Sequence, residues 1–273
     1  MIKENNSRYH AFNIVYQFDS TKHQLKSIRH EYYRKNNTSS SERSRSMVLS
    51  NEVVRWQRRL DSWISLSLDK PIKKLPPKVL SILRLAYYEY IMDDNIPVHA
   101  AVDSWVELSK KITNKKLSGL INAVLRKAHF INKKMPIPNQ DLASWQSFPD
   151  WMIANWVNQF GKSKTNKLID YLNQSHGTDL RLNLPIDKVE RRLLDQGISW
   201  SKSPNSKNFI RINSGLRKIL SSQIHLSGKV FVQNRAAGAV VEILNPKPSE
   251  TILDVCAAPG TKSIYIFQKM NQS

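Results

Sequence analysis

The chain has 273 residues, which is long enough for two domains and the start of a third. Hydrophobic residues make up 40% of it, so a packed core is expected and wholesale disorder is excluded. The formal net charge of +20, from 42 Lys and Arg against 22 Asp and Glu, favours a polyanionic partner such as nucleic acid. A generally basic protein without a specific partner would have the same charge.

The rest of the composition is typical of a cytoplasmic protein. Cys256 is the only cysteine, so no intrachain disulfide can form, as is usual in a reducing cytosol. The first ten residues lack the apolar segment of a signal peptide, and no apolar run approaches the length of a membrane span. We therefore expect a soluble, cytoplasmic monomer with no membrane partner and no metal site.

Residues 1–135 predict an all-helical domain, because apolar residues recur in them at spacings of three and four. The stripes cover residues 11–18, 53–63, 79–90, 102–112 and 117–128. The polar, Ser-rich segment 36–46 predicts a loop or a frayed helix start. This part holds 25 basic and 12 acidic residues, a balance of +13, so we expect it to bind structured RNA through phosphates.

A small α/β domain is expected at residues 145–225, after a stretch punctuated by Pro136, Pro138 and Pro149. Asp150 can cap a helix that runs to Phe160, and a second helix is expected at 164–173. Alternating apolar residues predict short strands at 180–184, 209–212 and 230–232.

Residues 226–273 predict the start of a third domain. A helix is expected at 233–244, with Ala236, Ala237, Val240 and Ile243 on its buried face. A short apolar strand at 252–255, a tight turn and a helix from Ser263 then form the opening unit of a Rossmann-like fold. The expected fold class is thus α plus α/β: a helical domain, a small linking domain and the first βα unit of a third.

The turn at residues 254–262 has the parts of a nucleoside site: small residues, and a helix N-terminus with free N–H groups. It lacks the glycine spacing of a dinucleotide fingerprint and of a phosphate-binding loop. On physical grounds alone this is a weak indication, since a strand, glycine turn and helix often bind nothing.

The sequence DVCAAPGTK in this turn resembles the first S-adenosylmethionine-binding motif of the Nop/Sun-type RNA cytosine-5 methyltransferases. That motif usually reads Asp-x-Cys-Ala-Ala-Pro-Gly-Gly-Lys-Thr, and here Thr261 and Ser263 replace its second glycine and its threonine. Residues 230–237 resemble the helix that leads into the family's methyltransferase domain. The resemblance implies S-adenosylmethionine as cofactor, held by Cys256, Ala257, Ala258, Pro259, Gly260, Thr261 and Lys262.

The helical half resembles a NusB-type antitermination domain, on the segments 84–89, 96–102 and 119–126. Segments 149–151 and 180–183 resemble the family's linking domain. This combination is similar to the ribosomal RNA small-subunit methyltransferase B group, which implies 5-methylcytosine formation in ribosomal RNA. The alternative is a non-catalytic RNA-binding or antitermination-type protein.

The family's two catalytic cysteines lie in Asp-Ala-Pro-Cys and Pro-Cys motifs, and neither motif occurs in this sequence. We therefore expect no catalytic residue in this chain, with the nucleophilic cysteine downstream of residue 273 and the chain inactive alone. Cys256 belongs to the cofactor turn by the same resemblance.

Arginines beside an aromatic residue suggest contacts with RNA, at Arg55, Arg58 and Arg59 around Trp56. The alternative is a solvated helix face whose Trp56 belongs to the core, and for Trp56 itself we favour the core. Phosphate contact by the lysine run 110–116 is an even alternative to a solvated helix end. His99 is expected to be structural.

Overall fold

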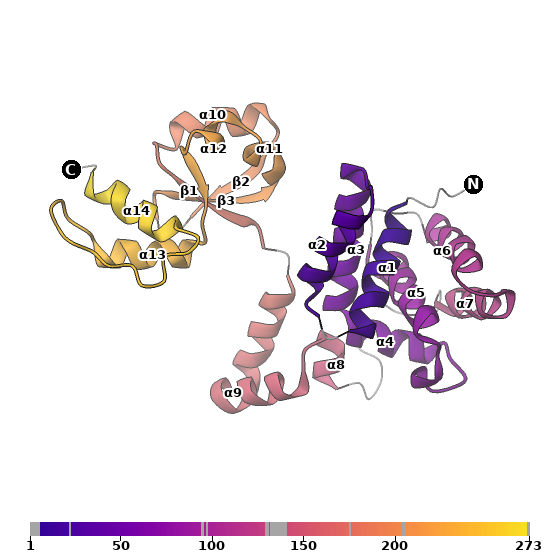
Figure 1. Ribbon diagram of the computed structural model, residues 1–273. Helices are drawn as coiled ribbons and strands as arrows, with labels where there is room; N and C mark the ends of the chain where they lie inside the picture. Colours follow the sequence, from indigo (N-terminus) through magenta and orange to yellow (C-terminus); the bar gives the residue numbers. More distant parts are fainter. Residues whose placement is uncertain are drawn as a thin grey trace. The chain divides into compact units, whose positions relative to one another are not determined.

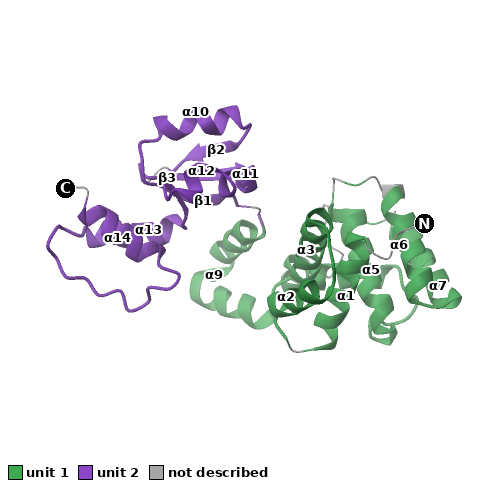
Figure 2. Cartoon of the chain, turned by 45° about the horizontal axis from the view of Figure 1, so that its top comes forward, with its two compact units in different colours: residues 1–173 green, residues 174–273 purple. Residues whose placement is uncertain are grey.

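The computed structural model describes residues 6–21, 23–93, 96, 98–128, 131, 141–174, 176–203 and 206–271. The chain divides into two compact units, residues 1–173 and 174–273 (Figure 2). The three-part division expected from the sequence stays a prediction. No helix in the described ranges is long and apolar enough to span a bilayer.

The first unit contains an all-helical bundle, as expected (Figure 1). Its helices are α1 (Ser7–Ser20), α2 (Leu25–Lys35), α3 (Ser40–Arg55), α4 (Gln57–Leu66), α5 (Pro77–Tyr87), α6 (Val98–Ile112) and α7 (Lys115–Lys127), with short turns η1 (Ile72–Lys74) and η2 (Tyr88–Met92). The predicted apolar stripes form one core, in which Trp56, Trp63 and Trp105 are buried. In the Ser-rich segment, α3 starts with a reciprocal capping box between Ser39 and Glu42.

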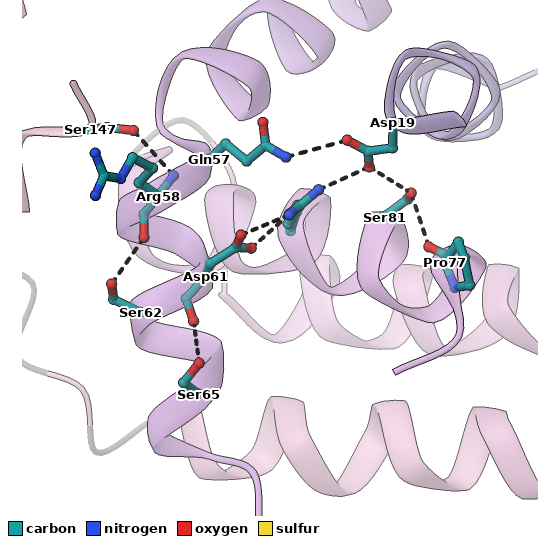
Figure 3. A network of polar contacts seen from close by, with 10 residues as sticks. Asp19, Gln57, Arg58, Asp61, Ser62, Ser65, Pro77, Ser81 and Ser147 are labelled. Atoms are coloured by element: carbon teal, nitrogen blue, oxygen red, sulfur yellow. Dashed lines mark hydrogen bonds and ion pairs between the residues drawn. The ribbon is translucent and has the colours of Figure 1, made fainter. Parts of the chain in front are cut away.

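Two ionic clusters, each built around one buried charged residue, hold these helices together. Arg84 of α5 donates to both oxygens of Asp61 at 2.7 Å and to Asp19 at 2.9 Å, which joins α1, α4 and α5 (Figure 3). Glu89, 1% exposed, accepts from Arg8 and Arg45 at 2.6 Å and from the Trp105 indole at 2.8 Å. The buried charges of Arg84 and Glu89 are thereby paired, as a stable buried charge requires.

Helices α8 (Leu142–Gln146) and α9 (Asp150–Asn173) also belong to the first unit. Gly161 lies inside α9 with a φ of 76°, a left-handed value that glycine adopts without steric cost. The backbone turns at this residue, so α9 is two consecutive helices, as the sequence predicts.

The second unit is built on an antiparallel sheet of order β2-β3-β1-β4. Its strands are β1 (Thr178–Leu182), β2 (Ser199–Lys202), β3 (Phe209–Ser214) and β4 (Val230–Val232). One face carries an apolar core that includes Leu180, Ile210 and Val230 and packs against α10 (Asp187–Asp195), α11 (Leu216–Leu220) and α12 (Gln223–Leu226). The other face is covered by α13 (Arg235–Leu244) and α14 (Thr261–Met270), so the unit has three layers (Figure 1).

Two expectations for this region are wrong. The buried face of α13 is formed by Gly238 and Val241, whereas Val240 and Ile243 are 56% and 84% exposed. The reason is Gly238: a Cβ at this position would lie 2.1 Å from the Phe209 ring, so only glycine lets the helix approach the sheet this closely.

The strand expected at residues 252–255 does not form either. These residues form a loop and the start of a turn without strand pairing, and Leu253 and Val255 are 83% and 85% exposed. A strand needs a neighbour to pair its N–H and C=O groups, and the described residues supply none here.

Candidate functional site

The turn at residues 254–262 is held in shape by its own polar groups. The Asp254 carboxylate accepts from the backbone N–H of Cys256 at 3.1 Å and from the Ser263 hydroxyl at 2.8 Å. The Lys262 ammonium donates to the Cys256 carbonyl at 3.2 Å. Gly260 has a φ of 98° and starts α14, a position where other residues would be strained. The residues that carry the motif resemblance therefore form one local structure.

The space beside this turn is open. A Cβ on Gly260 would meet no atom within 4 Å, and Cys256 is exposed. The free N–H groups at the start of α14 lie in the same turn. A nucleoside or amino-acid group could approach the backbone here, so the residues fit the near side of an S-adenosylmethionine site. Their assignment as cofactor ligands stays a prediction.

Helix α14 packs against the sheet and α13 of the second unit. Tyr265, 3% exposed, packs edge-to-face on Phe209 at 6.2 Å between ring centroids. Its hydroxyl donates to Glu242 of α13, and Lys269 pairs with the same carboxylate at 2.7 Å. Burial raises the pKa of Tyr265 to about 12, so the phenol stays protonated. Helix α14 is thus held against the sheet by the packing of Tyr265 on Phe209.

The covered face of the sheet holds charged residues that the sequence analysis missed. Asp179 and Arg181 of β1 are 6% and 1% exposed, and Gln233 beside them is 3% exposed. Burial by itself would raise the pKa of Asp179, yet hydrogen bonds from Arg235 and Arg211 lower it to about 2. The backbone N–H of Arg235 also donates to Asp179, so this carboxylate fixes the start of α13.

The three arginines expected to contact RNA are engaged within the first unit. The guanidinium of Arg59 lies 4.3 Å and 4.0 Å from the ring centroids of Trp56 and Trp145, and burial lowers its pKa to about 10. Arg58 donates to the Phe148 carbonyl and pairs with Asp150 at 2.8 Å. These contacts hold α8 and the start of α9 against α4.

Arg55 is the most exposed of the three, and it donates to the Leu172 carbonyl at 2.8 Å. RNA contact by this trio stays a prediction, and the geometry favours it least for Arg59. Trp56, 7% exposed, belongs to the core as expected.

Four exposed lysines lie where two helices of the bundle meet in sequence. Lys110 and Lys111 end α6, and Lys115 and Lys116 begin α7, all four on the surface. Beside them is an apolar groove of about 540 Å³ lined by Tyr16, Pro76, Pro77, Lys78, Ile112, Thr113, Asn114 and Leu117. The side chain of His99 lies outside the described residues. In the ranges that are described, no cluster of His, Cys, Asp and Glu could hold a metal ion.

Comparison with known proteins gives matches over both units. The NusB family model matches residues 5–130. A protein from Synechocystis named probable ribosomal RNA small subunit methyltransferase B is 34% identical over 225 residues, which cover 80% of this chain and 50% of that protein. Its Bacillus subtilis counterpart of the same name is 26% identical over 242 residues, covering 82% and 50%. The chain thus spans about half the length of these relatives.

A solved structure shows the same fold. The crystal structure of PH0851 superposes on 97% of this chain with a TM-score of 0.63, at 19% identity, and the match covers 60% of the PH0851 chain.

A mouse protein is also similar in sequence. It is named 28S rRNA (cytosine-C(5))-methyltransferase and is 28% identical over 145 residues, which cover 49% of this chain and 17% of that protein.

Proposed function

Because this chain carries a NusB-family domain at residues 5–130 and is similar to ribosomal RNA small subunit methyltransferase B over about 80% of its length, we propose that it is part of an RNA methyltransferase. The proposed reaction is transfer of a methyl group from S-adenosylmethionine to carbon 5 of a cytosine in small-subunit ribosomal RNA. One observation carries the proposal: residues 254–262 fold into a turn whose backbone is open beside Gly260.

In this proposal the two units have different tasks. The first unit binds RNA phosphates through exposed lysines, because a surface with this excess of positive charge attracts a polyanion. The second unit presents the cofactor turn on α14, which Tyr265 fixes to the sheet.

Cys256 is not the nucleophile in this account. Its backbone N–H is bonded to Asp254 and its carbonyl to Lys262, so the residue is part of the turn itself. Attack on carbon 6 of the base needs an activated thiolate aimed at the ring. The 273 residues alone are therefore expected to show no methyl transfer, and Cys256→Ala in the natural protein should retain part of its turnover.

Titration of the isotopically labelled chain with S-adenosylmethionine, followed by NMR, tests the cofactor site. We expect weak, saturable shifts confined to the amides of residues 256–258 and 260–262, and their loss in Gly260→Val, whose side chain fills the open space and strains the turn. The matched control is Gly228→Val, at another left-handed glycine of the same unit, which should leave the shifts unchanged. Shifts only outside the turn would contradict the cofactor assignment.

RNA binding by the full chain gives a separate test. Affinity for a small-subunit ribosomal RNA fragment should fall steeply with salt, because each neutralised phosphate releases counterions. Replacing Lys110, Lys111, Lys115 and Lys116 by Ala should make the plot of log affinity against log salt concentration less steep. The slope should fall by up to about one for each phosphate that is no longer neutralised. The same change at the exposed Lys162, Lys164 and Lys167 of α9 is the control. Salt-dependent RNA binding without any cofactor-specific shift would favour a non-catalytic RNA-binding protein instead.

A further inference from the structure

Two buried charges on β1, two residues apart, have opposite surroundings. Asp179 accepts from Arg211 and from Arg235, both at 2.9 Å, so two cations neutralise it. Arg181 donates to the neutral amide oxygens of Gln233, at 2.6 Å, and Gln268. Over the described residues no carboxylate pairs with Arg181, and its Nη2 has no hydrogen-bond acceptor. A buried arginine in this situation lacks a negative partner.

Aromatic rings compensate this charge only in part. The Arg181 guanidinium lies 4.3 Å from the centroid of Tyr265 and 4.5 Å from that of Phe231. Ring faces attract a cation but carry no net charge. Burial lowers the pKa of Arg181 to about 10, which still leaves it a cation at neutral pH. The site therefore keeps a positive field of its own.

Arg181 also lines a cavity of about 400 Å³ within the second unit. The wall is made by Leu182 at the end of β1 and residues 183–187 after it, by Lys207 and Asn208 before β3, and by Tyr265 and Gln268 of α14. Lys207 is exposed and adds a second cation, whereas Asp187 is the acidic residue of this lining. The cavity thus has a net positive lining and is large enough for a phosphate group with an attached sugar.

We propose that this cavity is a binding site for a phosphate group, with Arg181 supplying the buried charge and Lys207 the contact at the rim. A phosphate brings the negative charge that the described residues do not give Arg181, together with oxygen acceptors for Lys207 and Asn208. A phosphate group, with its negative charge and several acceptor oxygens, suits a lining of two cations and one carboxylate. The site is separate from the cofactor turn, and it does not depend on the proposed methyl transfer.

Two sources of phosphate share this chemistry. Both a free phosphate and a phosphodiester of RNA present the oxygens that Arg181 and Lys207 require. A nucleic-acid backbone would additionally pass the exposed Lys207 at the rim. Titrations with inorganic phosphate and with a short oligoribonucleotide that has no terminal phosphate therefore separate the two sources.

The test is an NMR titration of the full chain at constant ionic strength, observing the Arg181 Nε–H and the Asn208 amide. We expect saturable shifts with inorganic phosphate, and a roughly three- to tenfold weaker affinity in Lys207→Ala, as for the loss of one charge-assisted hydrogen bond. Lys229→Ala removes an exposed lysine outside the cavity lining and should leave the affinity unchanged. Arg181→Gln should abolish binding, with the fold checked by the Tyr265 and Phe209 resonances.

Because Arg181 is buried, Arg181→Gln can unfold the second unit. In that case the phosphate affinity of Lys207→Ala, compared with that of Lys229→Ala, tests the proposal by itself. Saturable binding that weakens in Lys207→Ala and persists in Lys229→Ala supports the site. If the oligoribonucleotide displaces phosphate, the site binds an RNA backbone. If the oligoribonucleotide does not compete, the site binds free phosphate. Shifts that grow linearly with phosphate, or that are equal in the two lysine variants, would overturn the proposal.

Discussion

In residues 1–173, Glu89 is 1% exposed and pairs with two arginines, and Arg84 lies between two aspartates. In residues 174–273, Arg181 is equally buried but has no carboxylate within the described part of the chain, and Ile243, Leu253 and Val255 are more than 80% exposed. The first unit therefore pairs both of these charged groups internally. The second unit holds a buried charge without an ionic partner among the described residues, and these three apolar side chains lie on its surface.

The strongest test of this contrast removes a paired charge from the first unit. Glu89→Ala should lower the free energy of unfolding by about 3–5 kcal/mol, because Arg8 and Arg45 lose their buried partner and Trp105 its acceptor. Urea unfolding measures the loss. The control is Glu107→Ala, which breaks an exposed pair with Lys110 and should change stability by less than about 1 kcal/mol. Equal losses in the two variants would show that the buried cluster does not hold the bundle.

A second test uses the same substitution in a helix of each unit. Gly238→Ala places a Cβ 2.1 Å from the buried Phe209 ring and should destabilise the second unit by about 1–3 kcal/mol. Gly119→Ala in α7 meets no atom within 4 Å and should stabilise the first unit by up to about 1 kcal/mol. Thermal unfolding of both variants shows whether each substitution lowers or raises the stability. A neutral Gly238→Ala would mean that α13 does not pack this closely on the sheet.

The acid sensitivity of the second unit is the third test. The pKa of Asp179 is about 2 in the folded state, below its usual value, so its stabilisation is complete above about pH 4 and is lost as the pH falls through 2. The contribution at neutral pH is about 2 kcal/mol. Asp179→Asn should be less stable than the natural chain at pH 6 and should lose less stability between pH 5 and pH 2. Parallel pH profiles for the two proteins would contradict this role.

Helices and motif could be predicted from the sequence because each leaves a local pattern. The three-and-four spacing of the bundle helices survives in the structure, and the turn at 254–262 could be located from nine consecutive residues. Strand β2 was missed because Ser199, Ser201 and Lys202 are polar and exposed, without the alternation that marks a half-buried strand.

The errors arise where distant segments decide the outcome. The segment 252–255 has strand composition but no pairing partner among the described residues, so it forms a loop with Leu253 and Val255 exposed. Arg181 gave no indication in the sequence, because an arginine between Leu180 and Leu182 predicts a solvent-facing position. It is buried because α13 and α14 cover that face, and helices 50 and more residues away cannot be foreseen from the strand itself.

The most direct test of the central proposal, that this protein acts in the methylation of ribosomal RNA, is bisulfite sequencing of small-subunit ribosomal RNA from cells with and without its gene. The account predicts that a cytosine protected from conversion in the first sample becomes convertible in the second, and that expression of the gene restores the protection. An identical pattern of protected cytosines in the two samples would contradict it.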